Sequence, residues 1–265
     1  MDGCLQSGMD ITQGGSTYIF YSMYLTGLPN IIDSLSAIKK VVYEEGLISL
    51  KELQAAIVGN FEGRDDLRLL LVNKPPKYGN DEPYTDDIML EVVSFFAESV
   101  RQHTENAHPK FFFPLAIGTD PLYLVYGELI GATPDGRKAG SAIATNFSPV
   151  CGMAKKGIFS ALNSYTKVDY HKLGIDAEID LSVAEKFVRS KEGPYKIKAL
   201  IKSFLQMGGP IMCINVLDID TLKEAQIRPE EHKNLRVRAG GWQAYFVAMG
   251  EKHQETHIKR IAHGS

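Results

Sequence analysis

The interpretation of the whole chain depends on one stretch, residues 235–246, which reads Leu235-Arg236-Val237-Arg238-Ala239-Gly240-Gly241-Trp242-Gln243-Ala244-Tyr245-Phe246. Two adjacent glycines separate a short strand pattern from a run that contains three aromatic residues. Glycine accepts backbone conformations that a Cβ forbids, so a structural turn is one interpretation of this stretch. Composition alone favours the turn, and a functional interpretation needs support from the rest of the chain.

The composition is that of an ordinary globular protein. Of the 265 residues, 44% are hydrophobic and 23% are charged, which excludes disorder, collagen and a coiled coil. The net charge of -3 offers no basic field to a polyanion, so we expect no nucleic-acid partner. The most apolar window, residues 111–130, contains prolines and acidic residues, so we expect no membrane span.

The cysteines indicate a reducing compartment. There are three, Cys4, Cys151 and Cys213, and an odd, sparse set is not a disulfide framework. No pair has the Cys-x-x-Cys spacing of a zinc or iron–sulfur site. We therefore expect a cytoplasmic protein in which Cys151 and Cys213 are small core hydrophobes.

Residue periodicity predicts helices that alternate with short strands, which indicates an α/β fold. Helices are expected over residues 31–45, 86–101, 194–206 and 251–261. Strands are expected over residues 122–126, 158–168 and 211–217. Ser49 and Ser182 each stand three residues before a glutamate, the pattern of a capping box that begins a helix.

Two histidines on the last predicted helix, His253 and His257, have a spacing that can place both imidazoles on one metal. A zincin needs glutamate directly after the first histidine, and Glu255 comes one place late. The alternative is a solvated polar face, which we prefer, so no metal site is predicted.

Short motifs occur in a definite order before the glycine pair: Asp2-Gly3-Cys4, Asp10-Ile11-Thr12-Gln13-Gly14-Gly15, Asn60-Phe61-Glu62-Gly63, Pro76-Lys77-Tyr78-Gly79-Asn80-Asp81, Ala132-Thr133-Pro134-Asp135-Gly136-Arg137 and Ser148-Pro149. Together with the segment 238–242, they resemble the glycyl radical enzymes, the superfamily of pyruvate formate-lyase and the glycerol and diol dehydratases. The radical loop of that family reads Arg-Val-x-Gly-aromatic, and Ala239 stands here in the valine position. The resemblance covers essentially the whole chain.

The resemblance implies a catalytic Gly241, which stores the radical, and a loop supported by Arg238, Gly240 and Trp242. It implies no bound cofactor, because an AdoMet-dependent iron–sulfur activating enzyme installs the radical on the protein itself. A radical on a glycine Cα is stabilised by the flanking amide nitrogen and carbonyl. The radical centre prefers to be planar, and a Cβ would crowd that plane.

The fold that the resemblance implies is α/β, a partial ten-stranded β/α barrel of the glycyl radical enzyme type. Its helices pack outside and the glycyl radical loop lies inside. Residues 1–120 would be the mostly helical C-terminal part of the pyruvate formate-lyase-like barrel domain, and residues 121–265 the glycine radical domain. The implied partners are the activating enzyme, a small-molecule substrate and, in the full-length enzyme, a second copy in a homodimer.

The leading hypothesis is the C-terminal, radical-bearing portion of an anaerobic enzyme that is diol dehydratase-like or formate C-acetyltransferase-like. The radical on Gly241 would pass to a thiyl cysteine missing from this chain, because Cys4 lacks the Gly-Cys-x-x-Pro context of that residue. The chain alone is therefore expected to be inactive. The alternative is a non-catalytic spare-part module that complements a damaged glycyl radical enzyme in trans.

Overall fold

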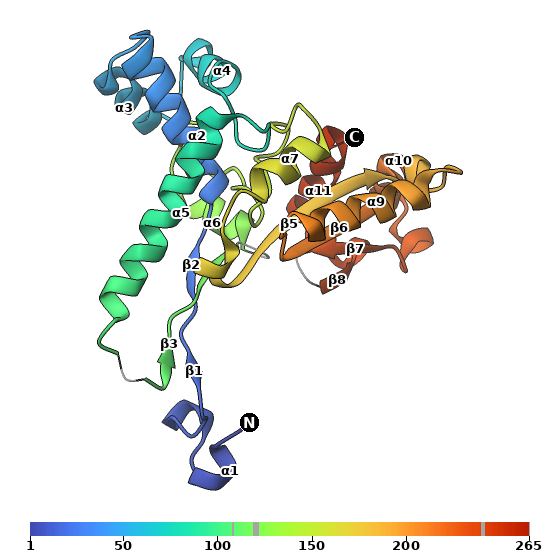
Figure 1. Ribbon diagram of the computed structural model, residues 1–265. Coiled ribbons are helices and arrows are strands. Elements are labelled where there is room, and N and C mark those ends of the chain that lie inside the picture. The colour runs from blue at the N-terminus through green and yellow to red at the C-terminus, as the bar shows by residue number, and fades with distance from the viewer. Residues whose placement is uncertain (108, 119–121, 240–241, 265) are drawn as a thin grey trace.

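Parallel strands and the helices that cover them form the body of the protein (Figure 1), which the computed structural model describes over residues 1–107, 109–118, 122–239 and 242–264. The strands are β1 (Ile19–Phe20), β2 (Met23–Leu25), β3 (Phe111–Phe112), β4 (Leu115–Ile117), β5 (Gly174–Ala184), β6 (Ile211–Leu217), β7 (Arg236–Ala239) and β8 (Trp242–Tyr245). The α-helices are α1 (Cys4–Ser7), α2 (Leu28–Ala37), α3 (Leu50–Val58), α4 (Asp65–Asn73), α5 (Pro83–Thr104), α6 (Tyr123–Leu129), α7 (Ile158–Tyr165), α8 (Glu185–Val188), α9 (Gly193–Gln206), α10 (Ile219–Ile227) and α11 (Glu251–Gly264). Within those residues, no helix is both long enough and apolar enough to cross a membrane.

A four-stranded sheet in the order β2-β4-β5-β6 organises the molecule. All three strand pairs in it are parallel. The β5–β6 ladder is the longest and runs without interruption from the pair Glu178↔Ile211 to the pair Ala184↔Leu217. Two smaller sheets flank it, a parallel pair of β1 and β3 and an antiparallel hairpin of β7 and β8.

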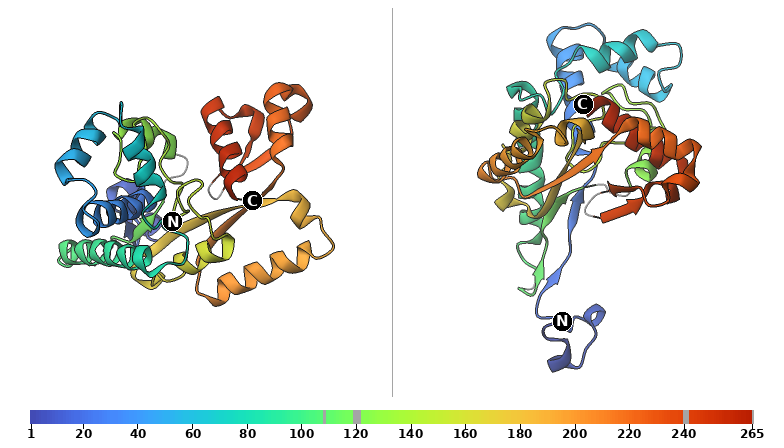
Figure 2. Two further views of the ribbon diagram at one scale, coloured as in Figure 1. Left: turned by 90° about the horizontal axis from the view of Figure 1, so that it is seen from above. Right: turned by 90° about the vertical axis from the view of Figure 1, so that its right-hand side faces the viewer.

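The two faces of β5 and β6 differ in chemistry. On the outer face, Ile179 and Leu181 of β5 join the core that contains Leu200 and Phe204 of α9. Side chains alternate along a strand, so the residues between them point to the opposite, inner face. In Figure 2, α9 lies on one side of these two strands, and α10 and α11 lie on the other.

Helices of the N-terminal half agree with the predictions in position and differ in detail. The capping box at Ser49 is confirmed, since its hydroxyl accepts from the Glu52 N–H while the Glu52 carboxylate accepts from the Ser49 N–H. The helix predicted over 31–45 begins earlier, and its second half, Ile38–Glu44, is a π-helix. An apolar repeat does not distinguish a π-helix from an α-helix, so this change cannot be predicted from the residue pattern.

Three predicted elements are wrong. The strand predicted over residues 158–168 is instead helix α7 over Ile158–Tyr165, followed by a turn, because Ile158, Ala161, Leu162 and Tyr165 have the spacing of one helical face. Residues 122–126 lie mostly in helix α6, and Ser182 does not begin a helix. Ser182 belongs to β5, whose alternating pattern continues past it to Ala184.

Strands β1 and β3 extend away from the body and carry α1 at their far end (Figures 1 and 2). Tyr18 and Phe20 are each 62% exposed there, and their rings contact Phe112 with centroid distances of 5.5 and 5.4 Å. We call residues 18–24 and 111–113 the aromatic ribbon. An exposed aromatic surface of this kind is typical of a surface that another polypeptide covers.

A buried carboxyl group lies among the N-terminal helices. Asp33 of α2 is 1% exposed, and its Oδ1 accepts a hydrogen bond of 2.8 Å from the Tyr78 N–H. Burial raises the pKa of Asp33 to about 7, since the nearby Lys77 ammonium and the Tyr78 N–H offset the loss of hydration only in part. Folding therefore favours the protonated form of this side chain.

The replacement Asp33→Asn tests this conclusion. The ordinary pKa of the group is 3.8 and the folded value is about 7, so its contribution to stability is complete below pH 3.8 and is lost as the pH rises through about 7. Relative to Asp33→Asn, the wild-type free energy of unfolding should fall by up to about 1.4 kcal/mol per pH unit in this window. Urea unfolding at several pH values in that range measures how the free energy of unfolding depends on pH. The control variant Asp87→Asn, at an exposed residue, should show the same pH dependence as the wild type. Parallel profiles for the wild type and Asp33→Asn would contradict the assignment.

Candidate functional site

The segment that the sequence singles out forms the β7–β8 hairpin. Its antiparallel ladder runs from the pair Arg236↔Tyr245 to the pair Ala239↔Trp242. The last pair stands on either side of Gly240 and Gly241, which lie outside the described residues. The predicted radical loop is therefore flanked by two regular strands.

Apolar packing anchors the base of this hairpin. Val237 and Phe246 are buried and share a core cluster with Leu222 of α10. The Phe246 N–H donates to the Leu235 carbonyl at 2.8 Å. These contacts hold the hairpin at the end remote from the glycine pair.

Asn215 of β6 binds the main chain of the hairpin nearer to that pair. The side-chain Oδ1 of Asn215 accepts from the Arg238 N–H at 2.8 Å, and its Nδ2 donates to the Arg238 carbonyl at 3.0 Å. Asn215 is 5% exposed, so both hydrogen bonds are shielded from water. The residue held in this way stands three positions before Gly241.

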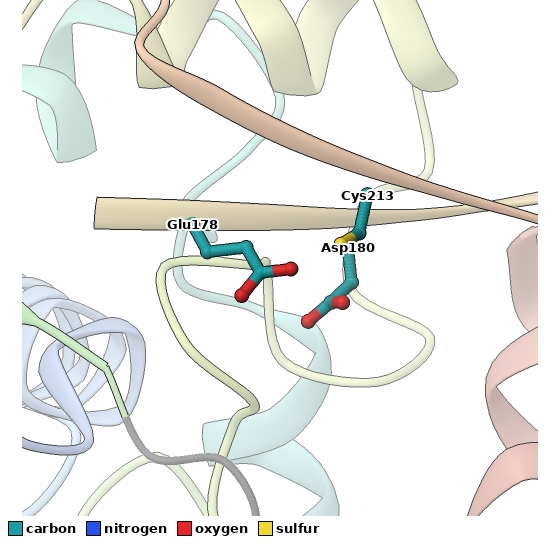
Figure 3. Close-up of side chains that lie close together, drawn as sticks. All are labelled: Glu178, Asp180 and Cys213. Atoms are coloured by element: carbon teal, nitrogen blue, oxygen red, sulfur yellow. The ribbon is translucent and has the colours of Figure 1, made fainter. Parts of the chain in front are cut away.

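A cluster of polar side chains lies on the inner face of the sheet beside this contact (Figure 3). Potential ligand atoms of Glu178, Asp180 and Cys213 all lie within 4.8 Å of one another. The parallel register explains the cluster, because Asp180 pairs with Cys213 across the β5–β6 ladder. The Arg238 Nε–H donates to the Cys213 sulfur at 3.2 Å, so the hairpin also contacts the cluster through a positively charged side chain.

The loop 143–149 supports the carboxylates of this cluster from the side. The Asp180 N–H donates to the Ser148 hydroxyl at 2.9 Å, and the Asn146 Nδ2 donates to Asp180 Oδ2 at 3.1 Å. Asp180 also borders a cavity of about 320 Å³, whose walls come mainly from residues 142–158 and include Thr256 of α11. The cluster therefore connects the hairpin to a cavity beside the sheet.

The Cys213 thiol is held in its neutral form. Burial, followed by the hydrogen bond to Glu178, raises the pKa of Cys213 to about 12, although the hydrogen bond from Arg238 acts in the opposite direction. Arg238 in turn has a raised pKa, first through its hydrogen bond to Cys213. A neutral thiol can accept from the guanidinium and donate to the carboxylate at the same time.

This protonation state disfavours a metal at the cluster. A metal ion binds the thiolate, and a pKa of about 12 keeps that form rare at neutral pH. Arg238 also places a positive charge against the sulfur. The arrangement is therefore better suited to a hydrogen-bonded network that receives the hairpin.

The other predicted residues have mixed outcomes. The backbone of Trp242 begins β8 and its side chain lies outside the description. Cys213 is buried, though in a polar cluster, and Cys151 is exposed, so the prediction of two core hydrophobes is wrong for Cys151. The prediction that both histidines of α11 lie on a solvated face is wrong for His257, which is 3% exposed.

The sequence interpretation missed four residues of this face, Glu178, Asp180, Cys213 and Asn215. A signal for the first two was present, since residues 175–183 alternate strictly between apolar or small residues and polar ones. That pattern is typical of a strand with one polar face. Asn215 carried no signal, because its role depends on a segment 23 residues away.

The reactivity of the cysteines tests the description of Cys213. With iodoacetamide at pH 8, Cys151 should be alkylated readily, whereas Cys213 should react at least about a hundredfold more slowly because its thiolate is rare and buried. Peptide mass spectrometry over time measures both rates, and unfolding in urea should make them similar. Equal rates in the folded protein would contradict the neutral, buried thiol.

Comparison with known proteins identifies the family. A family model described as Pyruvate formate lyase-like matches residues 1–114, and one described as Glycine radical matches residues 143–247. The chain is 30% identical over 260 residues to trans-4-hydroxy-L-proline dehydratase of Clostridioides difficile, covering 98% of this chain and 33% of that protein. It is 31% identical over 245 residues to isethionate sulfite-lyase of Nitratidesulfovibrio vulgaris, covering 89% of this chain and 28% of the relative.

Solved structures agree with the sequence matches. The glycerol-bound form of the B12-independent glycerol dehydratase from Clostridium butyricum superposes with a TM-score of 0.90 at 30% identity, covering 98% of this chain and 33% of that one. The chain thus spans about a third of the length of the relatives it matches. The predicted fold class, part of a glycyl radical enzyme barrel, is confirmed. The protein belongs to the glycyl radical enzyme family.

Proposed function

We propose that this chain is the radical-bearing portion of an anaerobic glycyl radical enzyme and that it stores the radical on Gly241. The observation that supports the proposal most is the segment Arg238-Ala239-Gly240-Gly241-Trp242, which falls within the range matched by the Glycine radical family. The described residues on both sides of the glycine pair form regular strands. One of these strands rests on a buried polar face through Arg238.

In this proposal, an AdoMet-dependent iron–sulfur activating enzyme removes one hydrogen atom from the Gly241 Cα. The chain's own residues position the loop and shield it. Arg238 orients the hairpin through its contact with Cys213, while Val237 and Phe246 fix the base in an apolar cluster. Gly240 and Trp242 would support the radical loop, as the resemblance implies. Shielding of the loop from water and oxygen would preserve the unpaired electron.

The complete enzyme would pass the radical to a cysteine thiol outside this chain, which would then attack a small-molecule substrate. The two dehydratases and the sulfite-lyase named above favour a reaction that eliminates a group from the substrate. Transfer of an acetyl group, as by a formate C-acetyltransferase, receives no such support from them. A homodimeric assembly and a cytoplasmic location remain predictions.

Activation followed by electron paramagnetic resonance tests the location of the radical. Anaerobic incubation with an AdoMet-dependent iron–sulfur activating enzyme and a reductant should give a doublet spectrum, because one hydrogen remains on the Gly241 Cα. The variant Gly241→Ala should give no signal. The exposed Gly250, where an added Cβ meets nothing closer than 3.9 Å, provides the control Gly250→Ala, which should give the wild-type doublet. A doublet that persists in Gly241→Ala would refute the assignment.

Oxygen provides an independent test of the same proposal. Exposure of the activated protein to air should add oxygen to the Gly241 Cα, break the chain between its nitrogen and that carbon, and release a C-terminal fragment in which an oxidised remnant of Gly241 precedes Trp242, which intact-mass spectrometry would detect. Protein that was never activated should stay whole. Cleavage in both samples, or in neither, would count against a radical at this position.

A second candidate function is repair in trans of a glycyl radical enzyme whose own loop has been damaged. The aromatic ribbon favours it, because Tyr18, Phe20, Tyr21 and Tyr24 are all more than half exposed, as expected of a surface that another polypeptide covers.

Addition of this chain to an oxygen-cleaved glycyl radical enzyme should then restore turnover after activation. The variant Phe20→Ser should reduce the recovery, because it removes an exposed ring that stacks on Phe112. Leu129→Ser, at a residue that is 77% exposed and outside the ribbon, serves as the control. Failure of the unaltered chain to bind or restore the damaged enzyme would exclude this candidate.

A further inference from the structure

We propose that Asn215 is a positioning residue, which sets where the β7–β8 hairpin rests on the inner face of β6 and thereby where the radical glycine lies. The chemical consequence rests on the proposed function of Gly241. The contact itself consists of described residues only. It is therefore testable without any radical.

The geometry of the hairpin explains why an outside contact is needed at Arg238. In an antiparallel ladder, pairs that exchange hydrogen bonds alternate with pairs whose N–H and C=O groups point outward. The bond from the Phe246 N–H to the Leu235 carbonyl marks that pair as bonded. The pair Arg238↔Gln243 lies three positions further along the ladder, so its N–H and C=O groups point outward. The main-chain groups of Arg238 therefore need a partner other than β8, and Asn215 supplies it.

Asparagine has the chemistry that this place requires. Its side chain offers one carbonyl acceptor and one N–H donor side by side, as a peptide group does. It therefore binds the Arg238 N–H and C=O together, at 2.8 and 3.0 Å, in the way that a neighbouring strand would. Because Asn215 is 5% exposed, water cannot readily replace either bond.

A side-chain contact differs in consequence from a strand pair. β6 and β7 belong to separate sheets, so no continuous ladder joins them. The hairpin is held at its base by Val237 and Phe246, and beyond the base by Asn215 and by the Arg238–Cys213 contact. Two hydrogen bonds from one side chain to the Arg238 main chain fix one register, and they can break and form again without any change in the β5–β6 ladder.

Amide hydrogen exchange tests the contact directly in the unactivated protein. In the wild type, the Arg238 amide should exchange as slowly as amides of the β5–β6 ladder. The loss of two buried hydrogen bonds in Asn215→Ala should accelerate exchange over residues 236–246 by roughly tenfold or more, while β5 stays protected. Asn215→Leu, which fills the space without polar atoms, should behave in the same way. The control is Asn234→Ala, at an exposed asparagine just before β7.

An Arg238 amide that exchanges at the rate of an exposed group in the wild type would overturn the proposal, even if both variants at position 215 fail to fold. Acceleration spread equally over the β5–β6 ladder and the hairpin would also overturn it, because Asn215 would then be a general structural residue.

The radical provides the second readout. In Asn215→Ala, installation of the radical should be several-fold faster and its lifetime in air several-fold shorter, because the hairpin separates more often. Asn234→Ala should match the wild type. Unchanged rates in Asn215→Ala, with a normal wild-type doublet, would contradict the positioning role. Absence of a doublet from the wild type would count against the proposed function, and the exchange data would still decide whether Asn215 holds the hairpin.

Discussion

The register between β5 and β6 is the constraint on which the rest of the site depends. Because Asp180 lies opposite Cys213 and Ser182 opposite Asn215, the two strands present one continuous polar surface. The residues in alternate positions, Ile179 and Ile214 among them, pack with α9 on the other face. A shift of one residue would bury the polar set in the apolar core, so packing on the outer face fixes the chemistry of the inner face.

The inner face of the sheet makes contacts both within the body of the protein and with the hairpin. The carboxylates of Glu178 and Asp180 are supported by the loop 143–149 and belong to the body of the protein. Among the described residues, side chains that join the hairpin to this surface include Asn215 and Cys213 of β6 and Arg238 of β7. Its base is fixed by apolar packing, which leaves the end near the glycine pair as the part that depends on polar contacts.

The sequence predicted the family, the fold class and the segment of interest, because these depend on ordered motifs and on local periodicity. Helix α9 and strand β6 were found for the same reason. Helix α7 was missed because its branched and aromatic residues resemble a strand, although their spacing is helical. The inner-face cluster could not be predicted in full, since it arises only when β5, β6 and the hairpin meet. Neither Cys213 nor Asn215 has a neighbour in the sequence that indicates its role.

The proposed chemistry requires that an unpaired electron be stored on the backbone of a glycine in this chain. Its most direct test is the electron paramagnetic resonance spectrum of activated protein produced with glycine deuterated at the α carbon. Deuterium couples far more weakly than hydrogen to the electron, so a radical on a glycine should give a doublet that collapses to a single line. A doublet of unchanged splitting would place the electron on another kind of residue and would rule out a glycyl radical.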